Sequence, residues 1–518
     1  MQQAKMDLTN ATVAVIGAGT MGIGIAQLAA MHGHKTYVFD VDVARTEQAL
    51  AQLQKQLAAR VEKGKMTQQL FDDTLANLHV AQHLQNLADV QLVIEAIVEK
   101  KEVKQSVFTQ LADICSTKTI FASNTSSISI TAIAATIPQP ERVIGLHFFN
   151  PAPVMKLVEV IRGLKSSQQI CDALLALMKT WKKVAVTAKS TPGFIVNRVA
   201  RPYYAEGFRA LQENVTTPEQ LDFLLRECGR FAMGPCELTD LIGQDINFSV
   251  TQSVYQEFFY EPRYRPSLVQ KELVDGGCLG RKSGQGFYHY QGKVQTPVFN
   301  LPEHQNIHAV SCIELYGTWA SMPDFVTRLQ KQEKIQILHH ESTDSFIKID
   351  DLTLRLTQGS SVDLSHVNDK VVFMDWHADW ENAKAIALTA SQACSCEEIE
   401  QVNAVFLSIN VIPVWLKDHP AMLTMRSVVC LVNEACEAVL QGIASEQDID
   451  SAMKYGVNYP QGPFQWAEKI GYNTILQILE KMYHIYSEEK YRPSLYLRKK
   501  AAQVNVQLTE TTTYRQAG

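Results

Sequence analysis

The sequence lacks the features that mark membrane, secreted and nucleic-acid-binding proteins. None of its apolar runs reaches the roughly eighteen residues that a membrane-spanning helix needs. The N-terminus, MQQAKMDLTN, has neither the apolar stretch of a secretory signal nor the arginines of a transit peptide. The chain has 54 acidic and 48 basic residues, a net charge of −6, which argues against a nucleic-acid surface.

The cysteines also lack any pattern. All ten are scattered without a C-x-x-C pair or the His-flanked spacing of a metal site, so we expect no metal and a reducing, cytoplasmic compartment. What is present is ordinary for a globular protein, with 46% apolar and 20% charged residues. A chain of 518 residues is long enough for three or four domains.

A strand, a glycine-rich turn and a helix open the first domain. Residues 12–16, TVAVI, are β-branched and apolar, GAGTMG follows at 17–22, and a helical pattern begins directly afterwards. This order predicts a dinucleotide-binding fold of the Rossmann type. A glycine-rich turn that binds nothing is the alternative.

Each glycine of this turn has a separate physical task. Gly17 permits the tight turn, Gly19 lets the backbone approach a pyrophosphate, and Gly22 lets the helix close on the strand. Thr20 and Met21 open the helix, whose free N–H groups favour an anion. We therefore predict that all five residues bind the cofactor.

The next strand indicates which cofactor binds. KTYVFD, at 35–40, ends in Asp40, about twenty residues after the glycines. A carboxylate there accepts hydrogen bonds from a ribose 2′-OH and repels a 2′-phosphate, so NAD is favoured. Arg45 lies close enough in the chain to leave NADP as the alternative.

An acidic residue lies in a run that otherwise predicts a buried strand. Glu159 lies in KLVEVI, and a carboxylate buried there costs several kcal/mol unless it is paired. His147 ends another apolar run, RVIGLHFF, twelve residues earlier. Imidazole is the usual base for oxidising an alcohol by hydride loss, and a carboxylate beside it stabilises the charged ring. On these residues alone, an edge charge and an ordinary strand-end histidine remain possible.

Two further polar clusters follow apolar segments. SNTSS, at 123–127, comes directly after a strand, where loop residues face ligands, although Asn124 or Ser127 could instead cap a turn. Asn197 lies in a predicted helix after Pro192 and Gly193. Because asparagine is a poor residue within a helix, we expect its side chain to have a partner.

Six motifs follow one another in an order that identifies a family. They are GAGTMG, EAIVE, SNTSS, GLHFFNPAPVMKLVEV, TPGFIVNR and RKSGQGFY. Over about residues 1–290 the chain resembles the L-3-hydroxyacyl-CoA dehydrogenases of β-oxidation. The resemblance implies an α/β Rossmann-like NAD-binding domain followed by an all-α C-terminal dehydrogenase domain.

The resemblance also implies roles for individual residues. His147 would be the general base that takes the proton of the 3-hydroxyl, and Glu159 would orient it. Ser126 and Asn197 would hydrogen-bond the substrate oxygens. The NAD contacts implied by the family are Asp40, Glu99, Lys104, Ser126, Asn150 and Lys282.

The coenzyme A contacts of the family lie in a helical pair that follows the second strand. Here that pair carries Lys55, Arg60, Lys63 and Lys65. They are candidates for binding the substrate's coenzyme A, and a solvated helix face is the alternative.

The helical domain is predicted to occur twice. MGPCELTDLIG (233–243) resembles QGPFQWAEKIG (461–471) at an offset of 228, and YRPSL recurs at an offset of 227. The offset pairs Asn197 with Met425, and no glycine turn precedes the second copy, so that copy is predicted to be structural. It could form an internal pseudo-dimer with the first, and homo-oligomers remain possible.

The predicted domains follow from these motifs. Residues 291–415 resemble a small α/β unit that could be a spacer, a substrate-pocket wall or a degenerate nucleotide domain. The boundaries expected are 8–188 for the NAD-binding domain, 189–290 for the first helical copy, 291–415 for the α/β unit and 416–510 for the second helical copy.

The expected function is reversible, NAD-dependent oxidation of a (S)-3-hydroxyacyl-CoA to the 3-oxoacyl-CoA, without a fused hydratase. The two-copy layout resembles dehydrogenases of bacterial phenylacetate breakdown, which implies 3-hydroxyadipyl-CoA as substrate. Alternatives are 3-hydroxybutyryl-CoA, a free β-hydroxy acid, and a non-catalytic NAD-binding structural protein. We expect neither a nucleic-acid nor a membrane partner.

Overall fold

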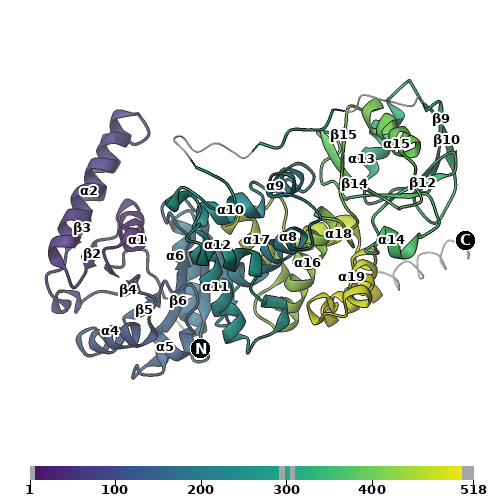
Figure 1. Cartoon of the computed structure of the whole chain (residues 1–518). Helices are drawn as coiled ribbons and strands as arrows, with labels where there is room; N and C mark the ends of the chain where they lie inside the picture. The colour runs from purple at the N-terminus through teal and green to yellow at the C-terminus, as the bar shows by residue number, and fades with distance from the viewer. Residues whose placement is uncertain (1–5, 291–297, 304–309, 504–518) are drawn as a thin grey trace, which may run out of the picture. The chain divides into compact units, whose positions relative to one another are not determined.

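The computed structural model describes residues 6–290, 298–303 and 310–503 (Figure 1). Residues 291–297, 304–309 and 504–510 of the predicted domains lie outside this range. The chain divides into two compact units. The first extends to Arg198 and includes residues 441–457, and the second contains 199–440 and the chain from 458 onward. Among the helices described, none is both long and apolar enough to span a bilayer.

The first unit contains an eight-stranded sheet in the order β3-β2-β1-β4-β5-β6-β7-β8. Every neighbouring pair is parallel except β6 and β7, which run antiparallel. The strands are β1 (Val13–Ile16), β2 (Thr36–Phe39), β3 (Leu78–Val80), β4 (Leu92–Glu95), β5 (Ile120–Ser123), β6 (Val143–Phe148), β7 (Leu157–Arg162) and β8 (Val184–Lys189). The helices of this unit are α1 (Thr20–Met31), α2 (Val43–Glu62), α3 (Gln68–Ala76), α4 (Lys101–Ile114), α5 (Ile130–Ala134), α6 (Gln168–Thr180) and α17 (Glu446–Gly456), and α7 (Val196–Val199) ends it.

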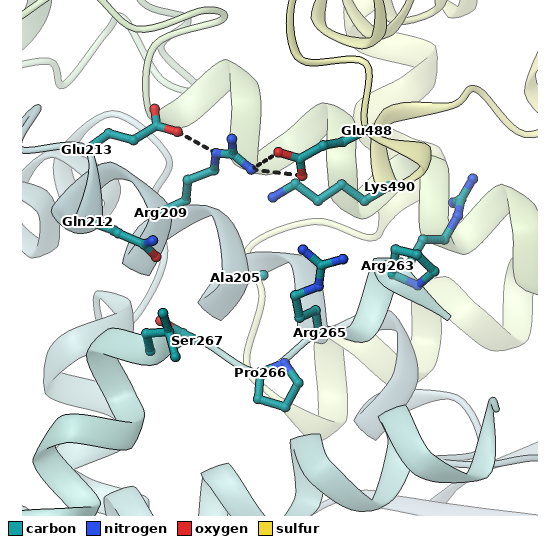
Figure 2. Close-up of a pocket in the computed structure, with 12 residues that line it drawn as sticks. Ala205, Arg209, Gln212, Glu213, Arg263, Arg265, Pro266, Ser267, Glu488 and Lys490 are labelled. Atoms are coloured by element: carbon teal, nitrogen blue, oxygen red, sulfur yellow. Dashed lines mark hydrogen bonds and ion pairs between the residues drawn. The ribbon is translucent and has the colours of Figure 1, made fainter. Parts of the chain in front are cut away.

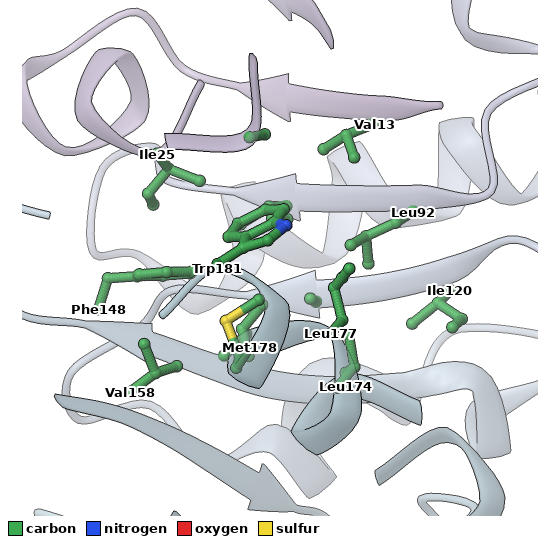
Figure 3. Close-up of a cluster of buried hydrophobic side chains, with 14 of the residues drawn as sticks. Val13, Ile25, Leu92, Ile120, Phe148, Val158, Leu174, Leu177, Met178 and Trp181 are labelled. Carbon is green, nitrogen blue, oxygen red and sulfur yellow. The ribbon is translucent and has the colours of Figure 1, made fainter. Parts of the chain in front are cut away.

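The core of the first unit lies between the sheet and two helices, α1 and α6 (Figure 3). Strands β1, β4 and β5 are buried along their whole length, as expected for parallel strands covered on both faces. Trp181 follows α6 and packs on Phe148 of β6 with ring centroids 6.4 Å apart. This packing holds β6, which carries His147, rigidly in the sheet.

The second unit joins the helical copies to a second sheet. Its helices are α8 (Arg201–Gln212), α9 (Pro218–Glu227), α10 (Pro235–Ile242), α11 (Gln244–Glu257), α12 (Leu268–Asp275), α13 (Pro323–Gln330), α14 (Val362–Ser365), α15 (Cys396–Ser408), α16 (Thr424–Leu440), α18 (Pro463–Ile470) and α19 (Tyr472–Tyr486). The second sheet has seven strands in the order β10-β9-β11-β12-β13-β14-β15. They are β9 (Cys312–Tyr316), β10 (Gln336–His340), β11 (Phe346–Ile349), β12 (Leu352–Leu356), β13 (Val371–Met374), β14 (Ala385–Ala390) and β15 (Ile412–Trp415).

The repeat extends further toward the N-terminus than the helical domains. Helix α15 starts 228 residues after α6, and β15 starts 228 residues after β8. Strands β13 and β14 run antiparallel and β14 and β15 run parallel, as do β6, β7 and β8 in the first unit. The second sheet therefore repeats the final part of the first, which the sequence alone did not reveal.

Each sheet carries a helix of the opposite helical copy. Helix α17, from the second copy, packs on β7 and β8 in the first unit, and its counterpart α9, from the first copy, packs on β14 in the second unit. A side chain at Gly456 of α17 would place its Cβ only 2.6 Å from Leu157 of β7. Each sheet is therefore covered by a helix that comes from the helical copy of the other half of the chain.

Candidate active site

His147 and Glu159 are direct partners across the only antiparallel pair in the first sheet, β6 and β7. Directly opposed residues in such a pair have Cβ atoms about 5 Å apart, close enough for the side chains to meet. His147 Nδ1 lies 2.7 Å from a Glu159 carboxylate oxygen, and both side chains are buried. The pairing proposed from the sequence is therefore present.

Glu159 has a second set of partners. Its other carboxylate oxygen accepts hydrogen bonds from the backbone N–H groups of Ile195 and Val196, both at 3.0 Å. These groups lie at the start of α7, where helical N–H groups have no partner within the helix. The carboxylate is thus satisfied on both oxygens, which explains how a charge is tolerated in a buried strand.

Asn197 lies on the same short helix and contacts the polar loop after β5. Its side-chain amide donates to the backbone oxygen of Ser126 at 3.4 Å, and both residues are half-buried. Because Val196 binds Glu159, a continuous set of contacts joins His147, Glu159, Asn197 and Ser126. The structure brings all four predicted catalytic residues together.

Glu99 supports the loop that carries Ser126. One of its carboxylate oxygens accepts from the Thr125 hydroxyl at 2.6 Å and from the backbone N–H of Ser126 at 2.9 Å. Burial alone would raise the pKa of Glu99, but Lys104 and these hydrogen bonds outweigh it and lower the pKa. The structure thus shows Glu99 positioning the loop, and its contact with NAD stays a prediction.

Glu95 is a site residue that the sequence analysis missed. It ends β4 and is fully buried, with Lys104 Nζ at 2.6 Å and the Ser123 hydroxyl at 2.6 Å. Lys104, itself buried, also reaches Glu99 at 3.1 Å. Glu95 therefore links the ends of β4 and β5, and Lys104 pairs with it. The contact of Lys104 with NAD stays a prediction. The available signal was a glutamate in an apolar strand, at the end of β4 for Glu95 and within β7 for Glu159.

The glycine turn leaves space for a pyrophosphate. Gly17 has φ +106°, and an added Cβ there would lie 2.5 Å from the Ala96 oxygen. A Cβ on Gly22 would lie 1.9 Å from the Gly17 oxygen. A Cβ on Gly19, by contrast, would meet no atom within 4 Å, and no side chain caps the start of α1. The residues present thus fit a dinucleotide phosphate at this helix start.

Asp40 lies beside this turn at the end of β2. One carboxylate oxygen accepts from the Ala18 N–H at 2.8 Å, so Asp40 also shapes the glycine turn. A pocket of about 490 Å³ adjoins it, with Phe39, Val41 and His83 among its lining residues. The pocket lies where the adenosine half of a dinucleotide would extend from the turn.

The remaining predicted contacts are more dispersed. Thr20 and Met21 begin α1, and Asn150 is exposed in the loop after β6. Lys282 belongs to the second unit, where its ammonium pairs with Asp245. Contacts of these residues with a cofactor stay predictions. The basic residues proposed for coenzyme A, Lys55, Arg60, Lys63 and Lys65, are all exposed.

Comparison with known families covers most of the chain. The NAD-binding domain of 3-hydroxyacyl-CoA dehydrogenase matches residues 12–191, and the C-terminal domain of the same enzyme matches 193–290 and 422–513. The reduced Rossmann-fold domain of 3-hydroxybutyryl-CoA dehydrogenase matches 354–420. The chain belongs to the 3-hydroxyacyl-CoA dehydrogenase family.

The chain is also similar to individual dehydrogenases of this family. An Escherichia coli 3-hydroxyadipyl-CoA dehydrogenase is 44% identical over 95% of this chain and 97% of its own. A 3-hydroxybutyryl-CoA dehydrogenase of Bradyrhizobium diazoefficiens is 40% identical over 55% of this chain and 97% of its own. A crystal structure of 3-hydroxybutyryl-CoA dehydrogenase from Escherichia coli has a TM-score of 0.86 and 43% identity, covering 95% of this chain and 98% of that one.

As a member of this family, the protein is an NAD-dependent dehydrogenase, and NAD is its cofactor. The predicted fold, a Rossmann domain followed by helical dehydrogenase domains in two copies, is confirmed. Of the three interpretations of residues 291–415, the family match favours a degenerate nucleotide domain over a spacer.

The second half of this dehydrogenase has different residues at the positions of His147 and Glu159. The offset of 228 places Asp375 at the position of His147 and Ala387 at the position of Glu159, and these two also face each other across their strands. Asp375 accepts backbone N–H bonds from Leu423 and Thr424, the counterparts of Ile195 and Val196. A carboxylate again binds the helix start, but it comes from the opposite strand, and neither of these two positions holds a histidine.

Proposed function

We propose that this dehydrogenase oxidises the 3-hydroxyl of a (S)-3-hydroxyacyl-CoA, with His147 as the general base. The observation that carries the assignment is the short contact between His147 Nδ1 and Glu159. A carboxylate accepts but does not donate hydrogen bonds, so Nδ1 carries the ring proton and the Nε2 lone pair stays available. Among the described residues no hydrogen bond occupies Nε2.

The proton leaves the 3-hydroxyl for His147 Nε2 as C3 becomes a carbonyl carbon. Glu159 stabilises the resulting imidazolium because its negative charge lies 2.7 Å from Nδ1. NAD bound at the glycine turn would supply the acceptor for the hydride that C3 releases. In the reverse direction, His147 returns the proton to the carbonyl oxygen.

Ser126 and Asn197 are proposed to hold the substrate oxygens. Both are half-buried and both offer polar groups. Their backbones are held in place, because Glu99 accepts from the Ser126 N–H and Glu159 from the Val196 N–H beside Asn197. Donors carried on a backbone that is held in this way align C3 with the base.

His147→Gln tests the mechanism. Glutamine keeps a polar side chain of similar size but cannot act as the base, so kcat should fall by about 10²–10⁴ while NAD binding is retained. NADH formation and the dissociation constant of NAD are the two measurements. Turnover close to that of the wild type would show that the base has been misassigned.

We further propose that the physiological substrate is 3-hydroxyadipyl-CoA. The support is the relative of that name, which matches nearly the whole chain, whereas the Bradyrhizobium 3-hydroxybutyryl-CoA dehydrogenase matches about half. The Escherichia coli protein whose crystal structure covers 95% of this chain is a 3-hydroxybutyryl-CoA dehydrogenase by name, so 3-hydroxybutyryl-CoA is the competing substrate. A kcat/KM at least about tenfold higher for the adipyl thioester, a difference of about 1.4 kcal/mol, would support the proposal. A preference for the butyryl thioester would reject it and leave the mechanism intact.

We propose that the two helical copies form an internal pseudo-dimer. Within the second unit, Tyr264 of the first copy donates to Glu434 of the second at 2.7 Å, and Tyr491 of the second donates to Glu206 of the first at 2.9 Å. These hydrogen bonds occupy buried groups on the faces that the two copies present to each other. Light scattering should therefore find no dimer mediated by the first copy, and such a dimer, independent of concentration, would contradict the proposal.

A further inference from the structure

Two phenylalanine rings pack against the imidazole of His147 within the first unit. The ring centre of Phe149 lies 4.5 Å from that of His147, and the ring centre of Phe194 lies 5.9 Å away in a T-shaped arrangement. Aromatic rings at these separations attract one another beyond the effect of the apolar area that they bury. Phe194 is fully buried, whereas Phe149 is half-buried. The imidazole is therefore held by two rings as well as by Glu159.

The hydrogen bond to Glu159 does not by itself fix the direction of the Nε2 lone pair. It holds one atom of the ring, because Nδ1 lies 2.7 Å from the carboxylate oxygen. The torsion between Cβ and the ring is broad in histidine, so the ring can still turn about this hydrogen bond. Any such rotation moves Nε2 away from the substrate oxygen that it must reach. Neighbouring rings that pack closely against the imidazole restrict this rotation.

The backbone conformation at Phe194 is common to both halves of the chain. Gly193 and Phe194 have φ values of +73° and +47°, and the two N–H groups that follow bind the buried glutamate. Their counterparts at the offset of 228, Ala421 and Met422, have φ values of +63° and +57°. The two N–H groups that follow them bind Asp375. The left-handed pair is thus a means of presenting the helix start to a carboxylate, which accounts for the positive φ at Phe194 without involving its ring.

The side chains at these positions differ between the two halves. The offset pairs Phe194 with Met422 and Phe149 with His377. The proposed base itself pairs with Asp375, so the half without a base at that position also lacks both phenyl rings. Because the left-handed pair forms with methionine, it does not require a phenylalanine. The two rings are explained instead by the imidazole beside them.

We propose that Phe194 and Phe149 are positioning residues, which hold the plane of the His147 imidazole so that Nε2 points at the 3-hydroxyl of the substrate. This inference rests on the proposed function, because it assigns to the rings an effect on the base. Phe194 is 0% exposed, so it reaches neither substrate nor cofactor and acts through His147. Its removal should therefore slow proton transfer and leave ligand binding unchanged.

The substitution Phe194→Met tests the proposal, since the second half already accommodates methionine at the equivalent position with φ +57°. We expect kcat to fall at least about tenfold, because displacing a reacting group by about 1 Å can cost a factor of about 100. KM for NAD and for the thioester should stay within about threefold of wild type. The solvent isotope effect on kcat, measured in D₂O, should rise as proton transfer becomes slower. A change in stability alone would not move the isotope effect.

The substitution Phe208→Met is the matched control. Phe208 is 1% exposed and stacks on Phe287 with ring centres 5.4 Å apart. It lies on α8, one residue before Arg209, which lines the pocket of about 280 Å³ shown in Figure 2. Among the described residues that line this pocket, none is predicted to bind NAD or substrate. Phe208→Met should therefore lower the melting temperature about as much as Phe194→Met, with kcat within about twofold of wild type.

Phe149 provides a second pair of variants, which decide the question if Phe194→Met fails to fold. Phe149→Met removes the ring and should also lower kcat about tenfold. Phe149→Tyr keeps the ring, and the half-buried position lets the added hydroxyl reach solvent, so kcat should stay within about threefold of wild type.

Two results would overturn the positioning role. One is a kcat within about twofold of wild type in Phe194→Met, or in Phe149→Met if the first variant does not fold. The other is an equal loss of kcat in Phe208→Met, which would trace the effect to stability. His147→Gln, assayed in parallel, keeps these outcomes separate from the proposed function. Turnover that survives in His147→Gln rejects the base, whereas its loss there, together with unchanged phenylalanine variants, rejects only the positioning role.

Discussion

The substitution Glu159→Gln separates the chemical role of Glu159 from its structural role. Glu159 accepts two backbone N–H bonds on one oxygen and the His147 Nδ1–H on the other. Glutamine offers one oxygen and one NH₂ group. If the NH₂ faced Ile195 and Val196, donors would oppose donors at two buried bonds, so the oxygen should remain there and the NH₂ should face His147.

That orientation places a donor against His147 Nδ1, which must then accept. The ring proton moves to Nε2, and His147 loses the lone pair that takes the substrate proton. We expect kcat to fall by about 10²–10⁴, or about 3–5 kcal/mol of transition-state stabilisation. The two N–H bonds also lose their charge assistance, at about 1 kcal/mol each, so the free energy of unfolding should fall by about 2 kcal/mol.

The second half of the chain provides a matched control. Asp375→Asn weakens the equivalent bonds to Leu423 and Thr424 but lies at a position without a catalytic base. Because Asp375 also accepts from the Met425 and Trp376 N–H groups on its other oxygen, the NH₂ of asparagine must face two donors. The free energy of unfolding should therefore fall by more than in Glu159→Gln, while kcat stays within about twofold. Steady-state NADH formation and urea unfolding of both variants are the assays. A Glu159→Gln variant with kcat within threefold of wild type would refute the tautomer argument, as would equal losses of kcat in the two variants.

Two further predictions concern the cofactor cradle and pH. Gly19→Ala adds a methyl group where no protein atom lies within 4 Å, so the affinity for NAD should fall at least about tenfold while the melting temperature stays unchanged. Gly17→Ala should instead destabilise the fold, because Gly17 has φ +106°. Titration with NAD measures the affinity, and an unchanged affinity of Gly19→Ala would place the phosphates elsewhere. Burial, aided by Arg426, lowers the pKa of His419 to about 4. In the unfolded chain this histidine binds a proton near pH 6.5, so protonation favours the unfolded state below that pH. The contribution of neutral His419 to stability is therefore present above pH 6.5 and is lost as the pH falls toward 4. About 2 kcal/mol of it is lost between pH 7 and pH 5. Urea unfolding of His419→Gln should lack this part of the pH dependence, and identical pH profiles would contradict it.

The local parts of the active site could be predicted from the sequence. A β-branched strand, three spaced glycines and a helix specify the dinucleotide turn because each is set by near neighbours. Glu159 was recognisable because a carboxylate in an apolar strand needs a partner, and His147 was the nearest chemically sensible one. The order of the family's motifs then supplied their roles.

The tertiary structure decided what depends on distant segments. It set the register that places His147 opposite Glu159, because strand pairing is a property of two strands and of neither alone. It revealed that Asp375, at the position equivalent to His147, makes the backbone contacts that Glu159 makes in the first half. The physical reason is that periodicity and propensity act over a few residues, whereas burial and ion pairing are determined by whichever segments the fold brings together.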